Sequence, residues 1–213
     1  MKKVFLFLIV SFIFSSTAYA ASLTLGNRIP AKYFVTGGVG QTDIGPGQDP
    51  WETGSYDLAL LQANIANFNV VPYTSVLPPE AQEISLEEAK KYFHHGAVIE
   101  VIMSSQNGVK GDTLVTGVGR IYVRSKKTKK VIGGFAAEYE EVYKSKQVPE
   151  AQGIKEAETF LRMSLLGEFS RRYDPNEYEY FGITYKTNYI YVKKKYGTCL
   201  TALAWLTYIY PRY

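Results

Sequence analysis

Four strand-like stretches and one long amphipathic helix fill the second half of this chain and constrain its fold more than any other feature. The strand candidates cover residues 97–103, 113–124, 131–143 and 180–192, each rich in β-branched or aromatic residues. Between the last two, residues 154–172 place apolar side chains on one helical face. The face consists of Ala157, Phe160, Leu161, Leu165 and Phe169.

The first half of the chain adds the pattern of strand, helix and strand. Residues 33–35 read as a strand that runs into a glycine-rich turn at 37–40, and 56–66 predict a helix with Leu58, Leu61 and Ile65 on one face. A short strand follows at 69–72. The whole predicts one α+β domain, and its order fits a helix–sheet–sheet–helix (αββα) sandwich. A simpler two-layer fold remains an alternative.

Two further segments complete the prediction. Residues 84–92 carry acidic and then basic side chains, as in a short exposed helix or turn. Residues 198–210 form a last apolar strand or helix.

The first twenty residues have the order of a secretory signal peptide. Lys2 and Lys3 precede an apolar run at 4–14, and Ala18-Tyr19-Ala20 is a small-residue cleavage site. We expect cleavage after Ala20, a mature chain of residues 21–213, and a periplasmic or secreted protein. An uncleaved segment, which would tether the domain to a membrane, is the alternative.

Charge excludes one large class of function. The chain has a formal net charge of +4, and removal of Lys2 and Lys3 leaves +2, which is too mild to predict nucleic-acid binding. The basic cluster 126–130 lies between two strand candidates and predicts a solvated hairpin turn.

The sequence gives little support for a metal site, a reactive thiol or a nucleotide-binding loop. His94 and His95 are the only histidines, and no ligands at metal-binding spacing accompany them, so we predict no metal. The single cysteine, Cys199, lies in an apolar run and predicts a small buried residue. The glycines at 37–40 lack the helix and lysine that a phosphate-binding loop needs.

The dipeptide Thr74-Ser75 is the strongest candidate for chemistry. Pro72 on one side and Pro78-Pro79 on the other restrict the backbone around it. A serine hydroxyl held in a suitable geometry can attack the carbonyl carbon of the preceding residue, and a nearby donor such as the Asn69 amide can stabilise the resulting oxyanion. On the dipeptide alone, an ordinary turn at a strand end is the simpler interpretation.

Motifs along most of the mature chain favour chemistry at Thr74-Ser75 over an ordinary turn. They are Tyr56-Asp57-Leu58-Ala59-Leu60-Leu61, Asn67-Phe68-Asn69, Tyr73-Thr74-Ser75-Val76-Leu77-Pro78, His95-Gly96-Ala97-Val98, Gly133-Gly134-Phe135-Ala136-Ala137-Glu138-Tyr139 and Lys195-Tyr196-Gly197-Thr198-Cys199. In order and spacing, these resemble the bacterial branch of the pyruvoyl-dependent arginine decarboxylases, from about residue 29 to 205.

The resemblance implies a role for each matching residue. The chain would cut itself between Thr74 and Ser75 into fragments 21–74 and 75–213, and Ser75 would become a covalent pyruvoyl group. Asn69 would assist the cut, Glu138 would be the general acid, and Asp57 would bind the guanidinium of the substrate.

The implied reaction is the conversion of L-arginine to agmatine and carbon dioxide through a Schiff base, with one proton consumed. The resemblance also implies a homo-oligomer, a trimer or a dimer of trimers, with sites between neighbouring subunits.

Two other functions stay open at this point. The same fold could decarboxylate another amino acid, or it could be a binding or structural homologue that never cuts itself. The intact mass of the purified protein separates the last possibility from the enzymes.

Overall fold

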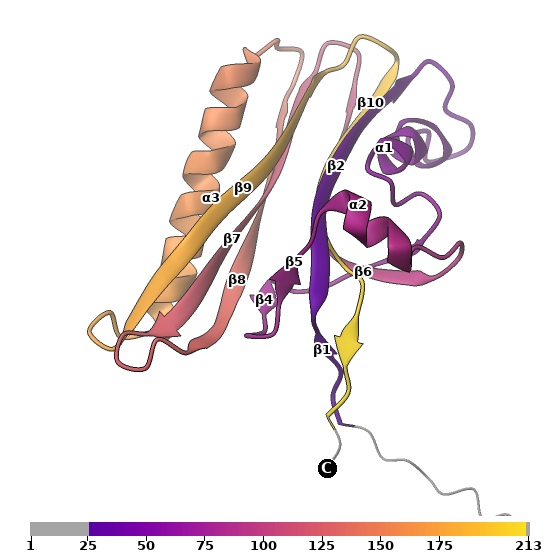
Figure 1. Cartoon of the computed structure of the whole chain (residues 1–213). Coiled ribbons are helices and arrows are strands. Elements are labelled where there is room, and N and C mark those ends of the chain that lie inside the picture. The colour runs from indigo at the N-terminus through magenta and orange to yellow at the C-terminus, as the bar shows by residue number, and fades with distance from the viewer. Residues whose placement is uncertain (1–25, 212–213) are drawn as a thin grey trace, which may run out of the picture.

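Two β-sheets stacked face to face form the centre of the molecule, with helices on both outer faces (Figure 1). The computed structural model describes residues 26–211. One sheet has five strands in the order β3-β6-β10-β2-β5, and the other has four in the order β4-β8-β7-β9. The α+β prediction is confirmed, and the layers are consistent with the expected helix–sheet–sheet–helix sandwich.

The strands and helices have the following bounds. The strands are β1 (Ile29–Pro30), β2 (Lys32–Thr42), β3 (Asn69–Pro72), β4 (Val76–Leu77), β5 (Gln82–Glu83), β6 (Val98–Val109), β7 (Thr113–Ser125), β8 (Val131–Tyr143), β9 (Tyr178–Tyr191), β10 (Tyr196–Trp205) and β11 (Tyr208–Ile209). The helices are α1 (Asp57–Gln62), preceded by one π-helical turn at Glu52–Tyr56, α2 (Leu86–Ala89), followed by a 3-10 turn at Lys90–Tyr92, and α3 (Glu150–Arg172).

Helix α3 covers the outer face of the four-stranded sheet. Its buried side chains include Ala157, Leu161, Leu165 and Phe169, four of the five residues expected on its apolar face. Phe160, the fifth, is half exposed and stacks on Tyr139 of β8. The predicted face is therefore correct except at its edge, where an aromatic contact replaces burial.

The glycine-rich turn expected at residues 37–40 is wrong, because strand β2 continues through it. Helix α1 lies directly against this part of β2: a Cβ on Gly38 would sit 2.0 Å from the carbonyl oxygen of Ala59. Glycine is needed here because the backbones approach so closely, a reason that local sequence does not reveal.

The expected apolar face of the first helix is wrong at two of its three residues. Ile65 is fully buried, as expected, but it lies beyond the end of the helix. The helix buries the small residues Ala59 and Ala63 on β2, whereas Leu58 and Leu61 are 42% and 54% exposed. It ends at residue 62 rather than 66, because Asn64 adopts a left-handed conformation (φ 62°) and the amides of Asn64 and Ile65 bond back to Leu61 and Leu60.

The two ends of the described chain meet. Strands β1 and β11 pair antiparallel, with Ile29 opposite Ile209 and Pro30 opposite Tyr208, and form a ribbon below the five-stranded sheet (Figure 1). The ribbon was not predicted, because each strand has two residues and its partner lies at the other end of the sequence.

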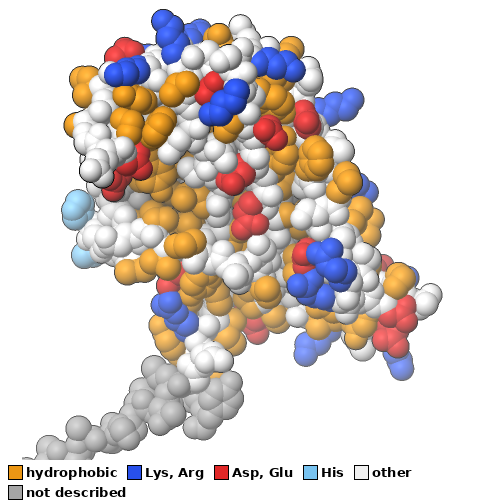
Figure 2. Space-filling view, turned by 180° about the vertical axis from the view of Figure 1, so that it is seen from behind, with side chains coloured by type: hydrophobic (Ala, Val, Ile, Leu, Met, Phe, Trp, Pro, Cys, Tyr) orange, Lys and Arg blue, Asp and Glu red, His pale blue; other side chains and the backbone are white. Residues whose placement is uncertain are grey.

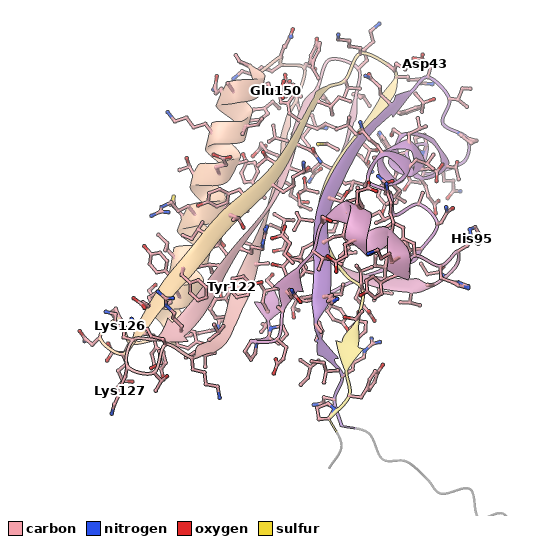
Figure 3. All side chains as sticks on the ribbon, in the orientation of Figure 1. Asp43, His95, Tyr122, Lys126, Lys127 and Glu150 are labelled. Carbon is pink, nitrogen blue, oxygen red and sulfur yellow. The ribbon has the colours of Figure 1, made fainter. Side chains whose placement is uncertain are left out.

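Three smaller predictions can be checked against the structure. Cys199 is fully buried, as expected. Lys126 and Lys127 lie at the β7–β8 turn and point outward, which confirms the solvated hairpin (Figure 3). None of the helices between residues 26 and 211 is both long and apolar enough to cross a lipid bilayer. The expected signal peptide lies outside the described residues.

Candidate active site

Backbone hydrogen bonds hold the Thr74–Ser75 peptide from both sides. Upstream, the Tyr73 amide donates to the carbonyl of Val101 on β6 (2.7 Å). Downstream, the carbonyl of Ser75 accepts a bond from the amide of Ala136 on β8 (2.9 Å), and β4 then pairs with β8. The peptide therefore bridges the two sheets, with one flank fixed to each.

The carbonyl of Thr74 accepts a hydrogen bond from within its own turn. The amide of Val76 donates to this oxygen at 3.1 Å, which closes a three-residue turn centred on Ser75. If the Ser75 hydroxyl attacks this carbonyl, the same amide faces the oxygen on which negative charge develops. The sequence cannot reveal this donor, because it belongs to the backbone.

Glu138 on β8 lies within hydrogen-bond distance of Ser75. The Ser75 hydroxyl donates to the carboxylate, with Oγ 3.1 Å from Oε2 and 3.2 Å from Oε1. The Glu138 side chain is accessible at the surface of the single chain, but surrounding protein atoms displace part of its hydration, which raises the pKa of its carboxyl group. The bond from Ser75 acts in the opposite direction and is the smaller effect.

A pocket of about 340 Å³ opens beside this pair, at the edge of β8 that the short β4 leaves uncovered. Helix α3 supplies the opposite wall with Ser164, Glu168 and Arg172. Arg172 pairs with Glu168, and its guanidinium lies 5.1 Å from the centre of the Phe135 ring. Sequence reasoning missed this wall, and nothing in the helix periodicity distinguishes these residues from an ordinary solvated face.

Asp57 and Asn69 lie elsewhere in the same chain. Asp57 is exposed in the first turn of α1, which covers the outer face of the five-stranded sheet (Figure 1). Asn69 is exposed at the start of β3, and its side-chain amide donates to the carbonyl of Gly96 (2.8 Å). Neither residue lines the Ser75 pocket, so one chain brings together Ser75, Thr74 and Glu138 only.

A second hollow lies next to β3. It measures about 400 Å³, and its lining includes Leu61 of α1 together with Phe68, His94 and His95. His95 projects from the side of the molecule opposite to α3 (Figure 3). Within residues 26–211, no three His, Cys, Asp or Glu side chains are grouped so as to hold a metal ion.

The class of site is defined by an α+β fold in which a serine hydroxyl donates to a carboxylate and the preceding carbonyl accepts a backbone amide. Comparisons with known proteins identify the family. Residues 32–210 match the family described as pyruvoyl-dependent arginine decarboxylase. The pyruvoyl-dependent arginine decarboxylase AaxB of Chlamydia trachomatis serovar L2 is 42% identical over 190 residues, which cover 86% of this chain and 94% of that protein. That of Chlamydia pneumoniae is 39% identical over 193 residues, or 87% of this chain and 95% of that one.

A more distant relative extends the match beyond one genus. Pyruvoyl-dependent arginine decarboxylase 2 of Archaeoglobus fulgidus is 28% identical over 139 residues, which cover 62% of this chain and 84% of that protein. The chain belongs to the family of pyruvoyl-dependent arginine decarboxylases. It is therefore an enzyme, and the family implies a covalently bound pyruvoyl group.

The residues around Ser75 fit such a group. The Thr74 carbonyl already has a donor, the Ser75 hydroxyl has a carboxylate partner, and a pocket of a size suited to a small-molecule ligand lies beside them.

Proposed function

We propose that this chain cuts itself between Thr74 and Ser75, and that Ser75 becomes the pyruvoyl group with which the enzyme converts L-arginine to agmatine and carbon dioxide. Family membership and the names of the relatives support the reaction and its substrate. The observation that carries the position of the group is the contact of Ser75 Oγ with Glu138, next to the Thr74 carbonyl that Val76 polarises.

In the self-cleavage that we propose, Ser75 Oγ bonds to the carbonyl carbon of Thr74. The Val76 amide stabilises the oxyanion, the hydroxyl proton passes to the Ser75 nitrogen, and the Thr74–Ser75 C–N bond breaks to leave an ester and a free amino group. Loss of the Ser75 α-proton then expels the Thr74 carboxylate from the β-carbon. The new chain begins with dehydroalanine, which takes up water and releases ammonia to give the ketone.

The pyruvoyl ketone supplies an electrophile that condenses with the amino group of the substrate and withdraws electrons from the bond to its carboxylate. Glu138 has the task of delivering a proton to the α-carbon after carbon dioxide leaves. Its raised pKa suits this task, because the carboxyl group then holds a proton at a higher pH than an ordinary glutamate does. Each turnover consumes that proton.

Substrate selection in this proposal needs a second copy of the chain. Asp57 binds the guanidinium through a bidentate ion pair, but it lies on the far layer from Ser75 of its own chain. A neighbouring subunit can bring its own α1 and β3 to the Ser75 pocket. We therefore propose a homo-oligomer, a trimer or a dimer of trimers, with sites between subunits.

Exposed apolar side chains support this association. Leu58 and Leu61 on α1, Val71 on β3 and Val98 on β6 are each at least 40% exposed, and Val76 beside Ser75 is 61% exposed. Figure 2 shows hydrophobic side chains gathered on the face next to the two histidines. Apolar surface of this kind, in two parts of one molecule, favours contact between copies.

The proposed location is the periplasm or the exterior, and it rests on the leader-like order of residues 1–20. Membrane attachment is part of the proposal only for a protein that keeps this segment.

The intact mass of the purified protein tests the proposal. We expect two fragments, residues 21–74 and 75–213, with the larger one resistant to Edman degradation because it lacks an amino terminus. Ser75→Ala should remain one uncut chain without activity. Ser164→Ala, which changes another serine of the same pocket, should cut normally. A wild-type protein that stays whole would contradict the proposal.

A further inference from the structure

A group of four side chains lies where the cleavage segment leaves the five-stranded sheet. They are Arg28, from just before β1, Tyr73, after β3, Glu100 of β6 and Tyr208 of β11. In sequence they are far apart, and the proposed cut separates them into two fragments, with Arg28 and Tyr73 in one and Glu100 and Tyr208 in the other. We call this group the terminal clamp.

Glu100 is the buried centre of the clamp. Its side chain is only 3% exposed, and its strand lies between β3 and β10, with Val71 and Trp205 as its register partners. A carboxylate at such a position needs partners that replace water. The guanidinium of Arg28 and the hydroxyl of Tyr208 both donate to it.

Arg28 connects this centre to the cleavage segment. Its guanidinium also donates to the hydroxyl of Tyr73 (3.1 Å), two residues before Ser75, and lies 4.8 Å from the centre of the Tyr208 ring. The Tyr73 ring packs against the core cluster that contains Tyr33, Leu77 and Trp205. One side chain near the start of the described chain therefore fixes the position of Tyr73.

The clamp depends on both ends of the chain. Arg28 and Tyr208 come together because β1 pairs with β11, and the amide of Gly26 also donates to the carbonyl of Pro211 (3.2 Å). Figure 1 shows this ribbon at one end of the molecule, below β6. The last strand of the sequence therefore helps to hold Arg28, which contacts Tyr73.

We propose that Arg28 is a positioning residue for self-cleavage, and that the terminal clamp holds Tyr73 so that the Thr74 carbonyl stays in line with Ser75 Oγ. The inference rests on the proposed function, since it concerns the same cut. Its physical basis is that an intramolecular attack depends steeply on the alignment of the reacting atoms, and a displacement of about 1 Å costs on the order of a hundredfold in rate. Arg28 touches none of the reacting atoms and acts through Tyr73.

The decisive variant is Tyr73→Phe, which removes only the hydroxyl that Arg28 reaches and leaves the Arg28–Glu100 pair intact. Arg28→Met removes the whole connection. Each precursor is made by cell-free synthesis, and its conversion to two fragments is followed over time on denaturing gels. We expect cleavage to slow about tenfold in Tyr73→Phe and about a hundredfold in Arg28→Met, with partial recovery in Arg28→Lys.

Matched controls come from a similar pair elsewhere in the chain. Lys32 donates to the hydroxyl of Tyr92 at 3.1 Å and pairs with Glu88, away from the cleavage segment. Tyr92→Phe and Lys32→Met should cut at the wild-type rate.

Two further readouts separate positioning from general destabilisation. The uncut Ser75→Ala protein with and without Tyr73→Phe should unfold at the same temperature, and the Tyr73→Phe enzyme, once cut, should keep the wild-type kcat and KM. Cleavage of Tyr73→Phe at the wild-type rate would overturn the clamp, whatever the rate of Arg28→Met, while the proposed function stands. An uncut wild-type precursor would instead overturn the proposed function itself.

Discussion

The Ser75 corner and the face formed by α1 and β3 differ in how completely one chain builds them. At the corner, the Ser75 hydroxyl already donates to the carboxylate of Glu138, and the carbonyl of the adjacent Thr74 already accepts a bond from the Val76 amide. On the other face, Asp57 on α1 and Asn69 at the start of β3 are exposed, and neither lines the Ser75 pocket. The difference matches two tasks: a cut within one chain needs its groups in that chain, whereas recognition of a substrate can be shared with a neighbour.

The largest effect is expected at the corner itself. Glu138→Gln should lower kcat by about 10²- to 10⁴-fold, the usual contribution of a general acid, because glutamine has no proton to deliver. The protein should still cut itself, more slowly, since glutamine can accept the Ser75 hydrogen bond and the Val76 amide remains.

Glu141→Gln, an exposed change on the same strand, is the control for Glu138→Gln and should turn over normally. Decarboxylation by Glu138→Gln at the wild-type rate would remove the carboxyl group from the chemistry.

The recognition face should produce a smaller and different loss. Asp57→Ala should raise KM for arginine by about 10- to 100-fold, the value of charge-assisted hydrogen bonds to one guanidinium, and should leave self-cleavage unchanged. Glu52→Ala, which removes an acidic residue one turn earlier, serves as the control.

Mixed subunits sharpen the comparison further. Asp57→Ala and Ser75→Ala chains that are produced together should regain activity, because a hybrid site can combine Ser75 of one chain with Asp57 of another. The measurement is the rate of arginine decarboxylation by the co-produced chains, and its control is a mixture of the two variants purified separately. If the co-produced chains are no more active than that mixture, each site lies within one chain.

A smaller effect is expected at Asn69. Asn69→Ala should slow self-cleavage by about tenfold, less than the 10²- to 10³-fold loss of an oxyanion donor, because Val76 already occupies that role and the Asn69 amide bonds to Gly96. The time course of fragment formation measures it, with Asn67→Ala as control. A loss of 10³-fold would mean that Asn69 reaches the Thr74 carbonyl of another copy.

The smallest effect concerns pH. Burial raises the pKa of Glu138, so kcat should be high at acidic pH and fall as pH rises through that raised pKa, where the acid loses its proton. The charge of Glu140 contributes to the same rise. Glu140→Gln should therefore move the midpoint of the fall to lower pH, by about a few tenths of a unit. A pH–rate profile of both proteins decides this, and a shift to higher pH would contradict it.

The parts of the fold that sequence predicts well are those that local patterns determine. Strand β8 has the predicted bounds and β7 extends one residue further, because the lysine-rich turn at 126–130 ends one strand and starts the next. The glycines of β2 and the exposed leucines of α1 were misread, since both depend on how closely a helix approaches a sheet.

In the active site, too, the residue types can be predicted from the sequence, whereas the contacts between them cannot. The resemblance picks out Ser75 and Glu138 separately, but their contact follows from the pairing of β4, a two-residue strand that no periodicity predicts, with β8. The Val76 donor and the α3 wall of the pocket require the folded backbone. Residue types can therefore be read from the sequence, while the distances between them cannot.

The strand order has a consequence for the protein after the proposed cut. Every strand before residue 75 pairs only with strands after it: β1 with β11, β2 with β10 and β5, and β3 with β6. The two fragments would remain interleaved in the five-stranded sheet without any covalent link, and neither could rebuild that sheet alone. After unfolding, each subunit of the mature enzyme would have to find its partner fragment before it could fold, so this step would depend on concentration. The uncut Ser75→Ala chain would need no partner fragment to fold, and only its assembly into oligomers would depend on concentration.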